Sequence, residues 1–196
     1  MDTHFALREP LRALGEHLSD RGQHAAVVIV GGTALNLLGV VHRPTRDVDV
    51  IAVGEPTTAG PPSAIAPPNP LPPFLEDAVA RVARDFDLPT DWFNVAVGEQ
   101  WKTGLPPGFE GRIKWHPFGG LWVGLPGRTD LLFLKLYATA DDVGPASRHF
   151  TDLVALHPTR EELREAAGWI TGTQDPSPAM RDVVQKVIQH VILRSR

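Results

Sequence analysis

Cysteine is absent from the 196 residues of this chain, so neither a disulfide nor a thiolate metal site can form. Long hydrophobic runs are absent too: the longest, Ala25 to Val30, cannot span a bilayer. Charged residues between Asp2 and Glu16 leave no apolar core for a signal peptide. These absences fit a reducing compartment, and we expect a cytoplasmic protein that associates with no membrane.

A strong excess of charge is also lacking. The 19 basic and 23 acidic side chains give a net charge of -4, which supplies no global field for nucleic acid, although a local basic cleft could exist beneath that average. An RNA substrate is therefore permitted but not indicated. With 42% hydrophobic and 21% charged residues, the composition is globular, and the length suits one domain or a core domain with a small helical appendage.

Proline is in excess, and many of the prolines lie in one place. Eight of the 19 prolines fall within residues 54–73, a segment with almost no charge. Because proline cannot donate a backbone hydrogen bond, neither a helix nor a strand ladder fits there. We predict an extended surface insertion that the core can fold without.

The rest of the chain shows periodic apolar patterns. Leucines at helical spacing from Leu7 to Leu18 predict a helix over residues 9–21, and the continuous apolar run Ala25 to Val30 predicts a strand buried on both faces. The same rules predict a helix at 34–38 capped by Thr33, a strand at 47–51, a helix at 74–86, a strand at 92–97, and a hairpin of 112–116 and 121–125 with a longer turn at 117–120.

The C-terminal part is predicted to be helical from residue 129, with a capping box formed by Thr159 and Glu162. A final helix carries an apolar stripe from Met180 to Ile192, which we expect to pack on the other C-terminal helices; a face for a partner protein is the alternative. The fold class is therefore mixed α/β (α+β), with a twisted sheet of about five strands flanked by helices. Residues 1–128 form the core with the insertion at 54–73, and residues 129–196 form a helical region packed on it.

Two acidic residues on the second strand are candidates for a metal site. Side chains alternate along a strand, so Asp47 and Asp49 share one face with Cα atoms roughly 6.8 Å apart. Hard divalent ions such as Mg²⁺ take oxygen ligands and keep substrate phosphate in their shell, and a two-ion site needs carboxylates that bridge metals about 4 Å apart. A plain exposed strand edge is the alternative.

The turn that precedes this strand could bind phosphate. Gly31 and Gly32 follow the first strand and begin a helix, so the backbone can approach a phosphate closely beside free N–H groups. In the alternative, the glycines only permit a tight turn and Thr33 only caps the helix. The short return from Gly39 to Asp47 nevertheless lets the turn and the acidic pair sit on neighbouring strands and face one site.

These residues resemble the signature of the polymerase-beta-like nucleotidyltransferase superfamily, in particular a small bacterial branch related to the AbiEii-type toxins of toxin–antitoxin systems. The signature comprises Gly31-Gly32-Thr33-Ala34-Leu35, Gly39, Arg43, Thr45, Asp47 and Asp49. A looser resemblance to the downstream helices of the branch comprises Asp130 to Lys135, Arg148 and Asp152-Leu153.

The resemblance implies a magnesium-dependent nucleotidyltransferase. Asp47 and Asp49 would hold Mg²⁺ (or Mn²⁺) on the triphosphate of an NTP, and the Gly31-Gly32-Thr33 turn would contact its β and γ phosphates, with Arg43 and Thr45 also in the nucleotide site. The nucleoside monophosphate would pass to an unknown acceptor, which could be a tRNA end, a protein or a small molecule. A toxin of this kind would have a cognate antitoxin protein as its partner.

Two residues of the implied site have alternatives. Lys135 would contact phosphate, or it is an ordinary lysine that extends from an apolar helix to solvent. Arg43 would contact phosphate, or it pairs with Asp47. For Arg148 and Asp152 we favour positions on a helix surface or in an ion pair between helices.

The chain departs from the resemblance at one position. Members of the superfamily carry a third carboxylate on a later strand, where this chain has Asn94, with Asp91 only at the start of that strand. The period-2 pattern places Asn94 on the face of Trp92 and Ala96, and we expect it to face the acidic pair. An amide cannot take a proton, so Asn94→Asp should raise turnover if the protein is a weakened enzyme. The alternative function is a catalytically weakened nucleotide-binding or partner-binding regulatory module.

Overall fold

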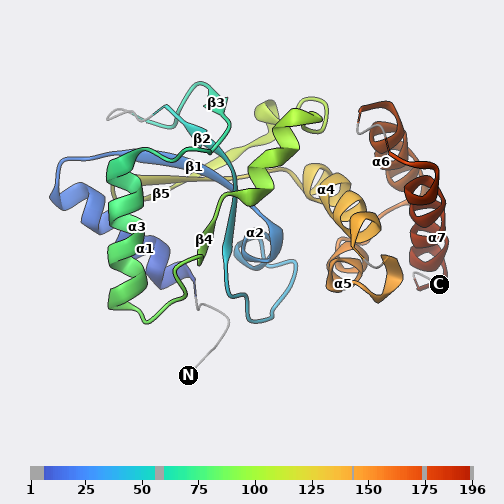
Figure 1. The fold of residues 1–196 in the computed structure, drawn as a ribbon, viewed down its shortest axis with the longest axis horizontal. Helices are drawn as coiled ribbons and strands as arrows, with labels where there is room; N and C mark the ends of the chain where they lie inside the picture. The colour runs from blue at the N-terminus through green and yellow to red at the C-terminus, as the bar shows by residue number, and fades with distance from the viewer. Residues whose placement is uncertain (1–6, 56–59, 143, 174–175, 195–196) are drawn as a thin grey trace. The chain divides into compact units, whose positions relative to one another are not determined.

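The computed structural model describes residues 7–55, 60–142, 144–173 and 176–194. The chain divides into two compact units (Figure 1). The first comprises Met1–Trp101 and Glu110–Pro126 and contains the sheet, and the second comprises Lys102–Phe109 and Gly127–Arg196 and contains the C-terminal helices. The short segment 102–109 groups with those helices, which no pattern in the sequence indicated. Within the described ranges, no helix is long and apolar enough to cross a membrane.

The first unit is built around a six-stranded mixed sheet, which confirms the α/β class and adds a strand to the expected number. Its strands are β1 Ala25–Val30, β2 Val48–Gly54, β3 Ile65–Ala66, β4 Phe93–Asn94, β5 Lys114–Phe118 and β6 Leu121–Leu125. The order is β3-β2-β1-β6-β5, with β4 also paired to β2. β1 lies at the centre, antiparallel to β2 and parallel to β6, and all six of its residues are buried. A strand buried on both faces explains its unbroken apolar sequence.

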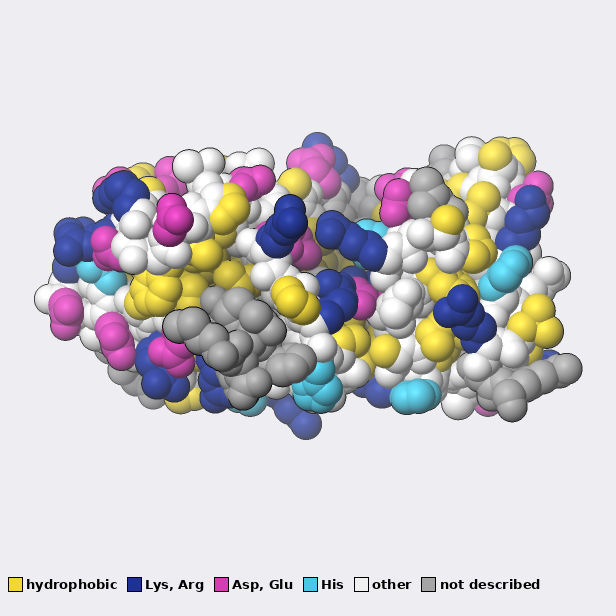
Figure 2. Space-filling view, turned by 90° about the horizontal axis from the view of Figure 1, so that it is seen from below, with side chains coloured by type: hydrophobic (Ala, Val, Ile, Leu, Met, Phe, Trp, Pro, Cys, Tyr) yellow, Lys and Arg dark blue, Asp and Glu magenta, His cyan; other side chains and the backbone are white. Residues whose placement is uncertain are grey.

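Three helices accompany this sheet: α1 Arg8–Asp20, α2 Gly31–Leu37 and α3 Pro73–Asp85. α1 packs against α3 and against the β5–β6 hairpin (Figure 1). Gly15 allows this close approach, because a Cβ there would overlap the carbonyl oxygen of Phe118. On the face of the molecule drawn in Figure 2, acidic and basic side chains are interspersed.

A β-bulge interrupts the pairing of β1 with β2. Val28 pairs with Ala52 but Ile29 pairs with Val50, so Ile51 is one extra residue on β2. The indole Nε1 of Trp101 donates a hydrogen bond of 2.7 Å to the Ile51 carbonyl. Trp101 therefore satisfies a carbonyl group at the point where the ladder is irregular.

The prediction for the proline-rich segment is wrong in part. Ile65 and Ala66 form a short ladder with the end of β2, because prolines occupy neither position. Pro62 is buried against Gly54, where a Cβ would lie 2.5 Å from the Pro62 ring. Pro68 covers Gly98 in the same way. The segment is thus mostly exposed, as predicted, but the ladder holds it to β2 and the buried Pro62 and Pro68 anchor it. Its last proline, Pro73, begins α3; residues 56–59 lie outside the described residues.

Two predicted strand boundaries are also wrong. The hairpin turn contains only Gly119 and Gly120, and Pro117 lies inside β5. This position is tolerated because β5 is the edge strand of the sheet. The strand expected at 92–97 ends after Asn94, and the chain turns into a 3-10 helix, η2 Ala96–Lys102. A further 3-10 turn, η3 Glu110–Arg112, precedes β5.

The second unit is helical, as the sequence predicts. It contains α4 Arg128–Asp141, the 3-10 turn η4 Gly144–Ala146, α5 Arg148–Ala155, α6 Arg160–Thr173 and α7 Pro178–Arg194. Val184, Val187 and Val191 of α7 are buried, and α7 contacts α4, α5 and α6. The expected packing of the final helix on the other C-terminal helices is confirmed.

The capping box at the start of α6 is also confirmed. The backbone N–H of Glu162 donates to Thr159 Oγ1 at 3.1 Å, and the backbone N–H of Thr159 donates to Glu162 Oε2 at 2.8 Å.

Candidate active site

The glycine turn lies directly against one carboxylate of the acidic pair. β1 ends at Val30, which pairs with Asp49 on β2. The next residue, Gly31, has φ of +71°, and a Cβ there would overlap Oδ2 of Asp49 and lie only 3.0 Å from its Cγ. Gly31 is therefore needed twice, for its left-handed backbone and for the space that Asp49 occupies.

Thr33, the last residue of the turn, contacts the segment that leads into β2. Thr33 is buried, and its hydroxyl donates to the Asp47 carbonyl at 2.7 Å and lies 3.1 Å from the hydroxyl of Thr45. The N-cap residue of α2 is Val30, and no side chain caps the helix. The expectation that Thr33 caps it is therefore wrong. Thr33 instead holds the Asp47 backbone beside the turn.

Arg43 lies beside Gly32. A Cβ on Gly32 would lie 2.6 Å from Cγ2 of Thr45 and 3.1 Å from Nη2 of Arg43. Asn36 fixes the Arg43 backbone, since its Nδ2 donates to the Arg43 carbonyl at 2.8 Å and its Oδ1 accepts from the Arg43 N–H at 3.3 Å. Sequence reasoning missed Asn36. An amide that faces an irregular loop from a short helix was the available signal.

The two aspartates differ in their local structure. Asp49 lies within β2, whereas Asp47 lies one residue before Val48, where the strand begins. Both are half-buried, as acidic side chains at the rim of a sheet can be. The structure thus places the Asp49 side chain against the turn and ties the Asp47 backbone to Thr33.

Asn94 lies next to Asp49, as predicted. The two residues pair across β4 and β2, and Asn94 Nδ2 donates to Asp49 Oδ1 at 3.1 Å. The amide oxygen accepts the backbone N–H of Ala96 at 2.9 Å. The period-2 argument fails beyond this residue, because the strand ends and Trp92 is fully buried. Asn94 orients the Asp49 carboxylate, and its oxygen is already engaged by the backbone.

The acidic groups on this segment are therefore the Asp49 carboxylate, held by Asn94, and the Asp47 carboxylate two residues before it. Across the described ranges, no cluster of three or more His, Asp or Glu side chains could hold a metal ion. Asp91 is exposed and precedes β4. One or two protein carboxylates completed by substrate phosphates is the usual way in which Mg²⁺ is bound in phosphoryl-transfer sites.

A family model described as "Nucleotidyl transferase AbiEii toxin, Type IV TA system" matches residues 12–116, more than half of the chain. The chain belongs to the AbiEii nucleotidyltransferase toxin family. No curated protein and no solved structure matches it. The match includes the Gly31 turn, the acidic pair and Asn94, so the whole arrangement described above lies inside the AbiEii region.

Lys135 lies outside the AbiEii match, in the second unit. Its Nζ donates to Asp152 Oδ2 at 2.7 Å, and the side chains of Lys135 and Asp152 are only 7% and 1% exposed. The Nζ also lies 3.4 Å from Nδ1 of His149. Burial, and then the Lys135 charge, lower the pKa of His149 below its ordinary value.

These contacts bear on the alternatives given above for Lys135 and for Asp152. A lysine that extends to solvent is excluded for Lys135, and Asp152 forms the expected ion pair between helices, whereas Arg148 is exposed.

Proposed function

We propose that this member of the AbiEii family is a Mg²⁺- or Mn²⁺-dependent nucleotidyltransferase. It would move a nucleoside monophosphate from an NTP to an RNA, protein or small-molecule acceptor, and it would act as the toxin of a toxin–antitoxin pair with a cognate antitoxin protein. The contact between the Gly31 turn and the Asp49 carboxylate carries this proposal. It brings a turn that can approach phosphate to a group that can hold a divalent cation.

The residues present fit a magnesium ion. Asp47 and Asp49 would hold it with hard oxygen ligands, and the cation would neutralise negative charge on the triphosphate. Asn94 holds Asp49 by one carboxylate oxygen, so it is a positioning residue in this proposal. Metal-binding carboxylates commonly have such hydrogen-bonded supports.

The remaining residues would bind the nucleotide. Gly32 has no side chain to block a phosphate, and the Arg43 guanidinium beside it can form paired hydrogen bonds to phosphate oxygens. Thr45 would contribute its hydroxyl from the same segment. Lys135 remains a proposed phosphate contact, and it would have to exchange its Asp152 partner for a phosphate.

A nucleotide-binding regulatory module is the second candidate function, and the side chain at position 94 supports it. Asn94 stands where the family resemblance implies a third carboxylate, and an amide cannot act as a general base. If the protein is a weakened enzyme, Asn94→Asp should raise turnover in the presence of Mg²⁺. Without metal, the same change puts two carboxylates side by side and should destabilise the fold.

The test of the proposed function compares binding with turnover. We expect calorimetry to detect an NTP only with Mg²⁺, and the double variant Asp47→Asn, Asp49→Asn to abolish that binding while leaving the fold intact. Asp91→Asn, which removes an exposed acid near β4, is the matched control and should bind normally. Pyrophosphate release and transfer of label from α-labelled NTPs to cell RNA or lysate protein then identify the acceptor. Binding that survives in the double variant would refute the assignment.

A further inference from the structure

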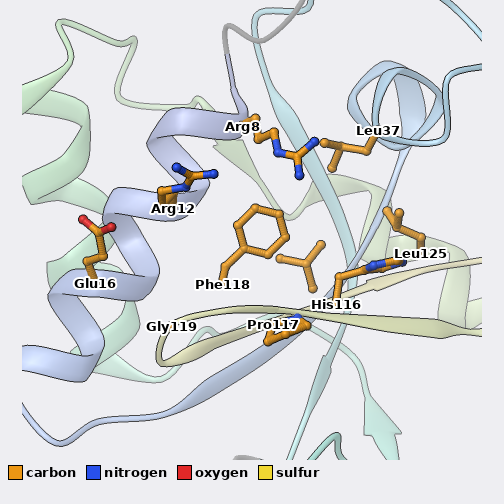
Figure 3. Close-up of a pocket in the computed structure, with 10 residues that line it drawn as sticks. Arg8, Arg12, Glu16, Leu37, His116, Pro117, Phe118, Gly119 and Leu125 are labelled. Atoms are coloured by element: carbon orange, nitrogen blue, oxygen red, sulfur yellow. The ribbon is translucent and has the colours of Figure 1, made fainter.

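A cavity lies in the first unit, between α1, the end of α2 and the β5–β6 hairpin (Figure 3). Its volume is about 450 Å³, which is within the range of small-ligand pockets. Arg8, Arg12 and Glu16 of α1 form one side, and Leu37, Phe118 and Leu125 are among the other lining residues. The cavity therefore combines two cations and one carboxylate with apolar surface.

This cavity is on the opposite face of the sheet from Asp49. Val123 lines the cavity and pairs with Val27 of β1, so these two side chains share a face. Val30 is three residues further along β1 and points to the other face, with its partner Asp49. A ligand in the cavity would thus be separated from the proposed metal site by the sheet.

The charged side of the cavity is suited to phosphate. Arg8 and Arg12 are four residues apart on α1, so both point from one side of the helix. Arg12 has only a 4.0 Å contact with Glu9 between two side chains that are each more than half exposed, which is a weak ion pair. Among the described residues, no carboxylate lies within ion-pair distance of Arg8. The two guanidinium groups outnumber the Glu16 carboxylate of the same wall, and they can receive one phosphate in the paired geometry that arginine favours.

The apolar side is suited to an aromatic ring. The Phe118 side chain lies in the middle of the cavity, between the arginines and Leu125 (Figure 3). His116 follows on the same strand face and adds a second ring at the wall. A planar base could stack on these rings while its phosphate contacts α1.

We propose that this cavity binds a nucleoside monophosphate group, either as a free nucleotide or as the terminal nucleotide of an RNA strand. Both sources present the same chemistry, a phosphate joined to an aromatic base. Such a site is distinct from the proposed NTP site, because the sheet lies between the two. Arginine contacts to the phosphate would hold the ligand without a divalent cation.

Calorimetry in EDTA with the full chain tests the proposal. The probes are AMP, CMP, GMP, UMP, inorganic phosphate and a 5′-phosphorylated trinucleotide. We expect saturable binding of at least one monophosphate, and weaker binding of inorganic phosphate. Arg8→Gln should weaken the nucleotide about tenfold, as expected for the loss of one charged hydrogen-bonding group. Phe118→Leu should weaken the nucleotide but not inorganic phosphate.

Two controls make the result decisive. Arg84→Gln removes an exposed arginine from α3 and should leave binding unchanged, and the Asp47→Asn, Asp49→Asn variant should also bind normally. Trinucleotide binding would identify an RNA end as the source, and binding of mononucleotides alone would identify the free nucleotide. The proposal is overturned if no probe binds, if the Arg8 and Arg84 variants bind equally, or if the acidic-pair variant loses binding.

Discussion

Replacement of Gly31 by alanine tests whether the glycine turn exists to accommodate the Asp49 carboxylate. Gly39 provides a matched control, because both glycines have φ of +71° but a Cβ on Gly39 would meet nothing within 4 Å. Both substitutions carry the cost of a left-handed backbone, roughly 1–2 kcal/mol. Only Gly31→Ala adds a steric overlap with Asp49.

The additional cost can be worked out from the contacts. The atom nearest to the new Cβ is the end of a side chain, so Asp49 should rotate away while the backbone stays in place. This rotation breaks the hydrogen bond from Asn94, and a bond to a charged group contributes about 1.5–3 kcal/mol. Gly31→Ala should therefore be less stable than Gly39→Ala by an amount in that range, and its affinity for Mg²⁺ and NTP should fall at least about tenfold.

Urea denaturation and calorimetry with Mg²⁺ and NTP measure the two effects. The same substitution in an Asp49→Ala background removes the overlap, so there Gly31→Ala should cost only about as much as Gly39→Ala. If Gly31→Ala binds Mg²⁺ and NTP within twofold of the unmodified protein, the turn does not position the carboxylate and the reasoning fails.

Three further outcomes are expected. Lys135→Met should lower the free energy of unfolding by about 3–5 kcal/mol in urea denaturation, because it removes the cation beside a buried carboxylate. Adding Asp152→Leu should recover most of this loss, and equal stability of the single and double variants would contradict the prediction. The hydrogen bond from Arg128 lowers the pKa of Glu162 from 4.5 to about 2, so this carboxylate stabilises the fold above pH 4.5 and the stabilisation is lost as the pH falls towards 2. The stability advantage over Glu162→Gln, followed by urea midpoints, should shrink across that window, and a constant difference would disprove it. Deletion of residues 60–71 should lower the melting temperature, because the segment pairs with β2 and packs on the sheet; an unchanged value would show that it is dispensable.

Short-range patterns made much of the first unit predictable. The unbroken apolar run of β1 and the alternating Asp-x-Asp pattern at β2 each predict a strand from local sequence alone. The family signature lies on the connection between these two strands. The prediction that Asn94 lies beside Asp49 was also correct. Phe93 and Asn94 do form a strand, so the alternation of side chains holds for these two residues.

Contacts between segments that are distant in the sequence could not be predicted. The ladder of β3 with β2 depends on two residues between prolines, and composition alone indicated a loop. Thr33 was assigned to a local cap, but its hydroxyl bonds to a residue 14 positions away. The partner of Lys135 is 17 positions away on another helix, so a single apolar helix gave no sign that the lysine would be buried.

The bulge at Ile51 has a consequence for how this chain can tolerate changes in length. In a regular strand, residues an odd number apart face opposite sides, yet Asp49 and Ala52 both pair with residues on one face of β1. Because of the extra residue, the Asp49 side chain faces the same side of the sheet as Ala52, although the two residues are three positions apart. A deletion of one residue at this point would leave the hydrophobic composition almost intact but would turn either Asp49 or the outer half of the strand to the wrong side. Insertions and deletions in related chains should therefore be excluded from the middle of β2.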